Sequence, residues 1–175
     1  MKKFGKLLAI AALAMVSYNA SAELAPQWEK GTMVGNVNVG FLGGVDFGTT
    51  ASLDYVLVDE WWMGHFTVGG IVGLSTWKFS SSDKFRYIAA SPRCTYGLNI
   101  TDNFEVHATV SLGVLFSAEK WDDIDGKARK DNHVYSFYED MIGCRYFFAD
   151  NLAVMAETGY SDRMPEFRVG ISYKF

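Results

Sequence analysis

The sequence is poor in the residues that mark several common protein classes. It has 3 prolines and 2 cysteines among 175 residues, too few for a collagen-like polymer or a disulfide-rich scaffold. It has no excess of positive charge, since the formal net charge is −4, and this disfavours nucleic acid as a partner. The one substantial apolar run, Leu7 to Val16, is roughly half as long as a membrane-spanning helix requires. Apolar residues still make up 49% of the chain, and we expect one folded domain.

The N-terminal residues have the composition of a secretory signal peptide. Three lysines within the first six residues precede the apolar run, and Ala20 and Ala22 form an A-x-A cleavage site. We therefore expect residues 1–22 to be a signal peptide that directs the chain into the general secretory route. Residues 23–175 would then be the mature domain, which is more acidic than the whole chain because cleavage removes lysines and no acid.

A two-residue period dominates the mature sequence. Between residues 104 and 116 every even position is apolar, whereas the odd positions are polar or glycine except at Leu115. Residues 166–175 repeat the alternation and end in Phe175. Side chains alternate across a β-strand, so this pattern predicts strands with one apolar face and one polar face.

The same two-residue period is interrupted by turn residues at intervals, and this predicts eight strands, an even number. The expected strands are residues 32–41, 47–57, 65–78, 85–98, 104–116, 134–148, 152–160 and 166–175. The hydrophilic residues 117–133 are expected to form a long loop. These features predict an all-β fold, an eight-stranded antiparallel up-and-down transmembrane barrel.

Charge and aromatic placement favour this barrel over a soluble one of the lipocalin kind, whose apolar side chains would point inward. The strand charges fall mostly on the polar face, and the apolar face is nearly free of them, as contact with hydrocarbon requires. Aromatic residues gather near the strand ends, with Trp61 and Trp62 toward one rim and Phe41 and Phe116 toward the other. Two such girdles are typical of barrels in an outer membrane.

On the signal peptide, the strand pattern and the ending Val169-Gly170-Ile171-Ser172-Tyr173-Lys174-Phe175, the sequence resembles the small outer-membrane barrel family of the OmpA/OmpX type. The resemblance implies residence in the cell outer membrane. It also implies that the barrel assembly machinery recognises the alternating residues of the last strand, namely Phe175, Tyr173, Ile171, Val169 and Phe167. Longer OmpA proteins continue into a peptidoglycan-binding domain after the last strand, and we expect no such tether here.

The polar face of the strands is predicted to carry an interior salt-bridge network. An eight-stranded barrel has an interior just wide enough for side chains, so charges that point inward must pair. The expected hairpin registers place Arg145 diagonally from Glu157, Arg168 near Glu157, and Arg93 close to His107. The predicted network consists of Arg93, Glu105, His107, Arg145, Glu157 and Arg168.

The two cysteines are predicted to be free thiols. An exported chain with two cysteines raises the question of a disulfide. Cys94 and Cys144 are expected on the fourth and sixth strands, about 10 Å apart across the intervening strand and beyond the ~7 Å Cα limit for a bridge. Both are expected on the lipid-facing side.

The functional expectation is a structural or surface-interaction barrel with an adhesion- or defence-like role. Its expected partners are outer-membrane lipids and lipopolysaccharide, with a surface protein or host ligand at residues 117–133. The alternative is narrow or gated transport of ions or small solutes, and bulky inward residues such as Phe137 and Met141 favour the first role. A remote alternative is an outer-leaflet lipid-modifying enzyme, for which His133 beside Asp131 is the outer-side candidate. We predict no enzyme, no cofactor and no metal site.

Overall fold

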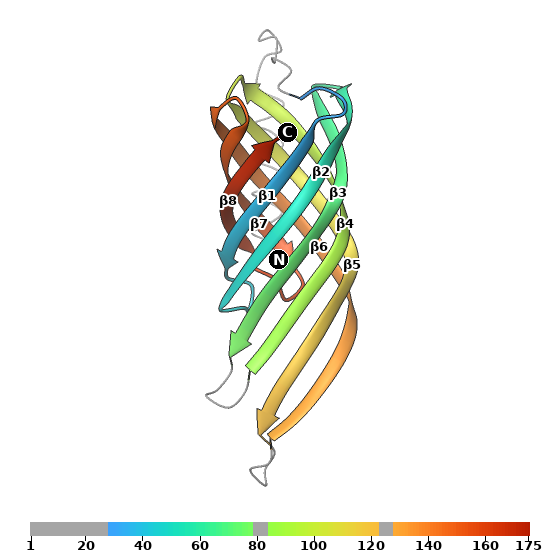
Figure 1. Cartoon of the computed structure of the whole chain (residues 1–175), viewed down its shortest axis with the longest axis vertical. Helices are drawn as coiled ribbons and strands as arrows, with labels where there is room; N and C mark the ends of the chain where they lie inside the picture. The colour runs from blue at the N-terminus through green and yellow to red at the C-terminus, as the bar shows by residue number, and fades with distance from the viewer. Residues whose placement is uncertain (1–27, 79–83, 123–127) are drawn as a thin grey trace, which may run out of the picture.

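The computed structural model describes residues 28–78, 84–122 and 128–175, so the predicted signal peptide lies outside the described residues. Antiparallel strands β1 to β8 follow one another in sequence order around a closed barrel, in which β8 pairs with β1 (Figure 1). The strands are β1 Met33–Phe41, β2 Phe47–Trp61, β3 Gly64–Lys78, β4 Lys84–Thr101, β5 Phe104–Asp122, β6 Ala128–Ala149, β7 Leu152–Ser161 and β8 Phe167–Lys174. This confirms the predicted all-β, eight-stranded up-and-down fold.

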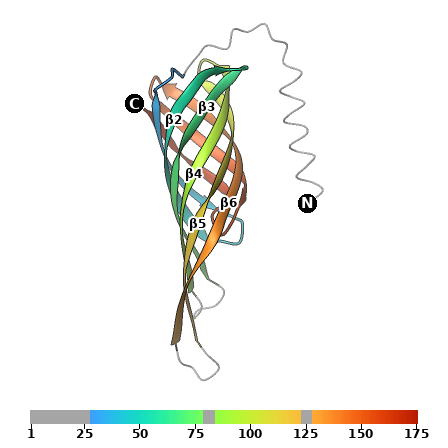
Figure 2. The same ribbon diagram turned by 90° about the vertical axis from the view of Figure 1, so that its right-hand side faces the viewer.

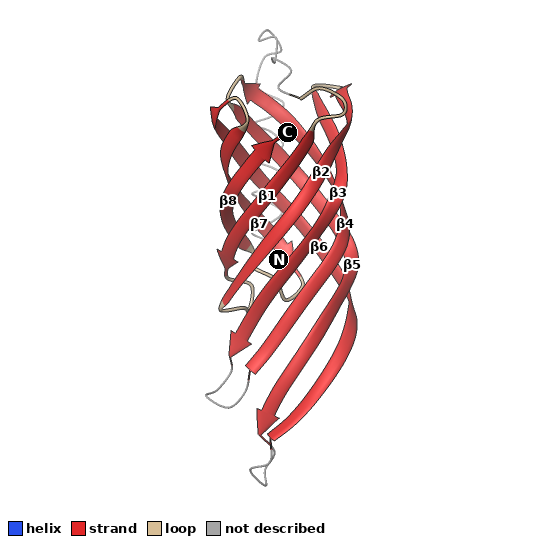
Figure 3. Ribbon diagram, viewed as in Figure 1, coloured by secondary structure: helices blue, strands red, loops and turns tan. Residues whose placement is uncertain are grey.

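The described part of the chain consists of strands and the short turns between them (Figure 3). Within the described ranges, no helix is long and apolar enough to cross a membrane. We call the end where β1 begins and β8 ends the termini end, and the opposite end the hairpin end.

The main correction concerns residues 117–133, which were predicted to be a loop. The β5–β6 ladder is continuous from Phe104 opposite Tyr146 to Asp122 opposite Ala128, and only residues 123–127 of this segment lie outside the described residues. The β5–β6 hairpin projects beyond its neighbours at the hairpin end (Figures 1 and 2). A backbone ladder needs no apolar side chains, so a hydrophilic composition did not exclude a strand here.

Burial alternates along the strands, with the polar face turned inward. In β5, Glu105 and Thr109 are buried, whereas Val110 and Leu112 are 50% and 65% exposed. A water-soluble barrel would have the opposite arrangement. The exposed apolar face is therefore suited to contact with hydrocarbon.

Two groups of buried apolar side chains lie inside the barrel. The first, here the Trp28 cluster, lies toward the termini end and consists of Trp28, Val34, Val56, Phe147 and Ala153. The second, here the Phe137 cluster, lies toward the hairpin end and consists of Tyr87, Ala89, Leu115, Phe137 and Met164. Trp28 precedes β1 and Met164 belongs to the β7–β8 turn, so residues outside the strands contribute to both clusters.

Both cysteines are free, as predicted. Cys94 of β4 is opposite Val110 of β5, and Cys144 of β6 is opposite Val106 of the same strand. Strand β5 therefore separates the two thiols.

Candidate functional site: the interior charged cluster

The six predicted network residues are all buried, with exposed fractions between 0% for Glu105 and 4% for Arg145. They lie between the two apolar clusters. On β6, for example, Arg145 and Glu139 occupy inward positions between Phe147 of the Trp28 cluster and Phe137 of the Phe137 cluster.

Glu157 of β7 brings three basic side chains together. Its Oε1 lies 3.4 Å from Arg93 Nη2 and 3.3 Å from His107 Nε2, and its Oε2 lies 4.0 Å from Arg168 Nη1. These partners come from β4, β5 and β8, so the Glu157 carboxylate links strands on different sides of the barrel.

Glu105 of β5 is the second carboxylate around which basic side chains gather. Arg145 pairs with Glu105, so the predicted pairing of Arg145 with Glu157 was wrong. Arg145 Nη1 donates to both Glu105 oxygens, at 2.7 and 3.0 Å, and does not take Glu157 as its partner. The remaining guanidinium nitrogens of Arg145 donate to Ser172 Oγ at 2.9 Å and to Asn36 Oδ1 at 3.3 Å. His107 Nδ1 lies 3.2 Å from Glu105 Oε1.

The predicted proximity of Arg93 to His107 in the β4–β5 register was wrong. β4 continues to Thr101, three residues further than expected, and this places Arg93 opposite Ser111 and His107 opposite Gly97. Arg93 and His107 are instead linked through the carboxylate of Glu157, which both contact.

Three members of the cluster were not in the predicted set. Arg93 Nε lies 3.4 Å from Asp54 Oδ1, Arg168 Nη2 forms an ion pair with Glu139, and His65 Nε2 lies 3.9 Å from Glu105 Oε2. The alternation of inward and outward side chains along a strand could have identified them. Glu139 and Arg145 of β6, for example, are an even number of residues apart, so both side chains point inward. We call the full set the interior charged cluster, namely Asp54, His65, Arg93, Glu105, His107, Glu139, Arg145, Glu157 and Arg168.

Glycines opposite the large polar residues make room for this cluster. Gly97 lies between His65 and His107 in the register, and a Cβ there would be 2.4 Å from His65 Cε1. Gly143 lies between His107 and Glu157, and a Cβ there would be 2.5 Å from His107 Nε2. Large and small residues thus alternate from strand to strand, because a narrow barrel cannot hold a large side chain from every strand at one level.

The contacts in the cluster match opposite charges and leave little room for other chemistry. Arginines and carboxylates form ion pairs with one another, and Ser and Thr hydroxyls add hydrogen bonds, as in Arg93 to Thr109 at 3.2 Å. Several buried atoms of the cluster, among them Arg93 Nε and Arg168 Nη1, have an acid nearby but no hydrogen bond. Among the described residues, no group of His, Cys, Asp and Glu is arranged to hold a metal ion. Outside the cluster, His133 Nε2 lies 3.2 Å from Asp131 Oδ2, with both side chains about half exposed.

The predicted assembly residues lie mostly on the outward face of β8. Val169, Ile171, Tyr173 and Phe175 are between 40% and 72% exposed, whereas Phe167 packs against Phe41 at a ring distance of 5.3 Å. Phe175 also packs edge-on against Tyr173 at 4.9 Å. Their role in assembly stays a prediction.

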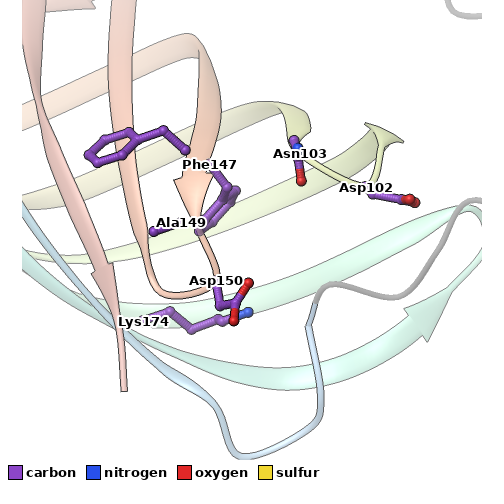
Figure 4. A pocket seen from close by; sticks show the side chains of 7 residues that line it. Asp102, Asn103, Phe147, Ala149, Asp150 and Lys174 are labelled. Carbon is purple, nitrogen blue, oxygen red and sulfur yellow. The ribbon is translucent and has the colours of Figure 1, made fainter.

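A small pocket opens at the rim of the termini end (Figure 4). Asp102 and Asn103 of the β4–β5 turn, Asp150 of the β6–β7 turn and Lys174 of β8 surround it. Phe147 also lines this pocket and packs against Trp28 at 5.5 Å. The Trp28 cluster therefore lies next to the pocket.

Comparisons with known proteins agree with this geometry. The family model described as outer membrane protein beta-barrel domain matches residues 7–175. Ail, the attachment invasion locus protein of Yersinia pestis, solved with the heparin analogue sucrose octasulfate, is 16% identical with a TM-score of 0.53, over 84% of this chain and 100% of that one. The backbone structure of Ail in a phospholipid bilayer nanodisc is 15% identical in sequence with a TM-score of 0.51, over 84% of this chain and 100% of that one.

A third solved structure, the N-terminal β-barrel domain of Pseudomonas aeruginosa OprF, is 14% identical with a TM-score of 0.50, over 84% of this chain and 98% of that one. At these identities the likeness concerns the fold. No curated protein matches the chain.

Proposed function

The chain belongs to the family of outer membrane protein beta-barrel domains, and from this premise we propose that its role is structural or surface-interacting, of the adhesion or defence type. Residence in the outer membrane follows from the family. The observation that carries the proposal is the position of the two buried apolar clusters, one on each side of the interior charged cluster.

This arrangement argues against transport as the main role. An ion path needs polar groups that are free to replace the hydration shell of the ion. Here the inward charges bind one another, and Trp28 at one end and Phe137 at the other are each only 1% exposed. A charged interior held in this way supports the barrel wall, and we assign it that structural role and no enzymatic one.

The surface-interaction part of the proposal concerns the hairpin end. The ends of β5 and β6, which hold residues 117–122 and 128–133, extend beyond the rest of the barrel, and we propose residues 117–133 as the segment that meets a protein or host ligand. The structure of Ail with a heparin analogue supports such a role in a barrel of this fold. Outer-membrane lipids and lipopolysaccharide are the further partners that we propose. Export would use the signal peptide of residues 1–22, and insertion would use the barrel assembly machinery.

Planar-bilayer recording tests the closed interior. We expect the refolded wild-type barrel to give no conductance steps, because both ends of the interior are filled. The double variant Trp28→Ala, Phe137→Ala removes one large side chain from each cluster, and we expect it to conduct. Trp62→Ala is the matched control, because Trp62 is 96% exposed. Conductance steps from the wild-type barrel would overturn the proposal in favour of transport.

Cysteine labelling tests the orientation. An even number of strands returns the chain to its side of entry, so we expect both ends in the periplasm and the hairpin end outside. In a Cys94→Ser, Cys144→Ser background, Asn132→Cys on β6 should react with an impermeant maleimide on intact cells. Asp150→Cys, in the β6–β7 turn, should react only after the outer membrane is permeabilised. The reverse pattern would contradict this orientation.

A further inference from the structure

The imidazole ring of His107 lies between two carboxylates deep inside the barrel. Its Nε2 lies within hydrogen-bond distance of Glu157 Oε1, at 3.3 Å, and its Nδ1 lies 3.2 Å from Glu105 Oε1. The His107 side chain is 0% exposed. Glu105 belongs to β5, like His107, whereas Glu157 belongs to β7. Each ring nitrogen therefore faces an acid, and the ring links two strands that are not neighbours in the sheet.

A histidine ring in this position needs a proton on both nitrogens. A neutral imidazole has one N–H donor and one lone pair, whereas an imidazolium has two donors. In a neutral ring, the lone pair of one nitrogen would face a carboxylate oxygen at 3.2 or 3.3 Å, and two acceptors repel each other. Nδ1 is not aligned for a hydrogen bond, so its contact with Glu105 is electrostatic. Only the imidazolium ring is attracted by both carboxylates.

The charge balance of the interior points to the same protonation state. Among the described residues, the buried side chains that carry a fixed charge are four acids and three arginines. The charged and titratable groups around His107 are Glu105 on its own strand, Asp54 on β2, His65 on β3, Arg93 on β4, Glu139 and Arg145 on β6, Glu157 on β7 and Arg168 on β8. Strand β1 contributes no titratable side chain. An uncompensated charge is unfavourable in a narrow interior, and a positive His107 supplies the fourth cation.

Asp54 is the acid that could hold the balancing proton instead, and its contacts favour the ionised form. Its Oδ2 accepts from Asn36 Nδ2 at 2.9 Å and from Ser52 Oγ at 3.4 Å, and its Oδ1 lies 3.4 Å from Arg93 Nε. Ser52 Oγ already accepts from Asn36 and Arg93, so its own hydrogen is free to point to Asp54. A protonated carboxyl group would need an acceptor, whereas these neighbours are donors.

His65, the other histidine of the interior charged cluster, lacks the arrangement of His107. Its Nε2 lies 3.9 Å from Glu105 Oε2, and its Nδ1 finds no hydrogen-bond partner among the described residues. Arg145 already binds the two Glu105 oxygens at 2.7 and 3.0 Å. The His65 ring packs against the Trp28 ring at 4.9 Å. One distant acid gives His65 little reason to hold a second proton.

We propose that His107 is a positively charged member of the interior charged cluster and makes the closed barrel sensitive to pH. With both ring protons in place, Glu105 and Glu157 share a cation. Loss of one proton leaves a negative charge in excess and turns a lone pair toward one of the carboxylates, so the link between β5 and β7 weakens. This goes beyond the proposed structural role, because the barrel is then held tightly in acidic surroundings and less tightly in alkaline ones.

Nitrogen NMR of the barrel labelled with ¹⁵N-histidine tests the protonation state directly. An unperturbed histidine titrates near pH 6.5. At pH 8 we expect His107 to show two N–H groups, whereas His65 and the exposed His133 show one each. The chain has 3 histidines, so spectra of His65→Gln and His133→Gln assign two rings and leave the third as His107. A neutral His107 ring at pH 7 would overturn the proposal.

Denaturant titration in lipid vesicles between pH 6 and pH 9 tests the consequence for stability. Above about pH 6.5 the unfolded chain loses the His107 proton while the folded chain keeps it. Folding then takes up a proton, so stability should fall as the pH rises, with the unfolding equilibrium constant increasing up to about tenfold per pH unit. The fall should end once the folded chain also loses this proton. His107→Gln should lose this pH dependence, and the matched control His65→Gln should keep it.

The outcomes separate His107 from the other titrating groups. A pH dependence that disappears in His107→Gln and remains in His65→Gln supports the proposal. A dependence that remains in His107→Gln, or disappears in His65→Gln, would overturn it, and so would a wild type whose stability is constant over this range. If His107→Gln does not fold, the NMR spectrum of the wild type still decides. Neither measurement depends on conductance, so failure here is distinct from failure of the closed-barrel proposal.

Discussion

Replacing Glu157 by alanine should lower the free energy of unfolding by about 3 kcal/mol, at the lower end of the range for breaking a buried ion pair. The Glu157 carboxylate contacts Arg93, His107 and Arg168, and its residue is 2% exposed. Its removal would leave two arginines with less compensating charge inside a narrow barrel. Water that enters the vacated space would reduce the effect, which is why we expect the lower end.

Denaturant titration in lipid vesicles measures this loss. Glu60→Ala is the matched control, because Glu60 is exposed at the end of β2 and its loss should change stability by a small fraction of that amount. Glu157→Gln keeps the size and some of the hydrogen bonds, so it should fall between the wild type and Glu157→Ala. If Glu157→Ala and Glu60→Ala were equally stable, the interior pairing of Glu157 would be wrong.

Deleting Phe175 should reduce the assembled fraction several-fold in cells and leave the stability of already folded barrel almost unchanged. The resemblance to outer-membrane barrels assigns the terminal aromatic residue to recognition by the assembly machinery. Its side chain is 72% exposed and packs edge-on against Tyr173, and its backbone N–H donates one hydrogen bond to Met33 O at 2.9 Å. The folded barrel therefore loses few contacts when Phe175 is removed. Heat-modifiable mobility of membrane fractions reports the assembled protein.

The conservative variant Phe175→Trp is the control for this experiment, and it should assemble nearly as well as the wild type. Phe175→Asp should resemble the deletion. If the deletion assembled normally, or if it lowered stability as much as assembly, Phe175 would be a packing residue and not a signal.

The strand order and the facing of side chains were predictable from the sequence because one physical rule controls both. The two-residue period follows from the geometry of a strand with one face in hydrocarbon. Short turns then fix the register, so Arg145 opposite Met155 and Arg168 opposite Glu157 are as expected. Where a turn was misjudged by a few residues, as after β4, the error passed to every contact that depends on it, including that of Arg93.

The length of the β5–β6 hairpin and the partners of Arg145 were not predictable by the same rule. Outside the membrane, backbone hydrogen bonds hold a strand together without any apolar face, so the sequence pattern lost its signal beyond Phe116. Contacts across the interior, such as Arg93 with Glu157, join strands that are not neighbours in the sheet. Local register does not define such distances, because they depend on how the sheet curves as it closes.

That curvature has a consequence for insertion of the chain into the membrane. Arg145 of β6 bonds to Glu105 of β5, but also to Ser172 of β8 and Asn36 of β1. The first bond can form within a single hairpin, whereas the last two require the first and last strands to be in place. A half-inserted sheet would thus hold a partly satisfied guanidinium and would lack the wall that shields it. Pairing of β1 with β8 removes both deficits at once, so closure is the step that satisfies Arg145, and an unclosed barrel would keep this guanidinium partly unpaired in the bilayer.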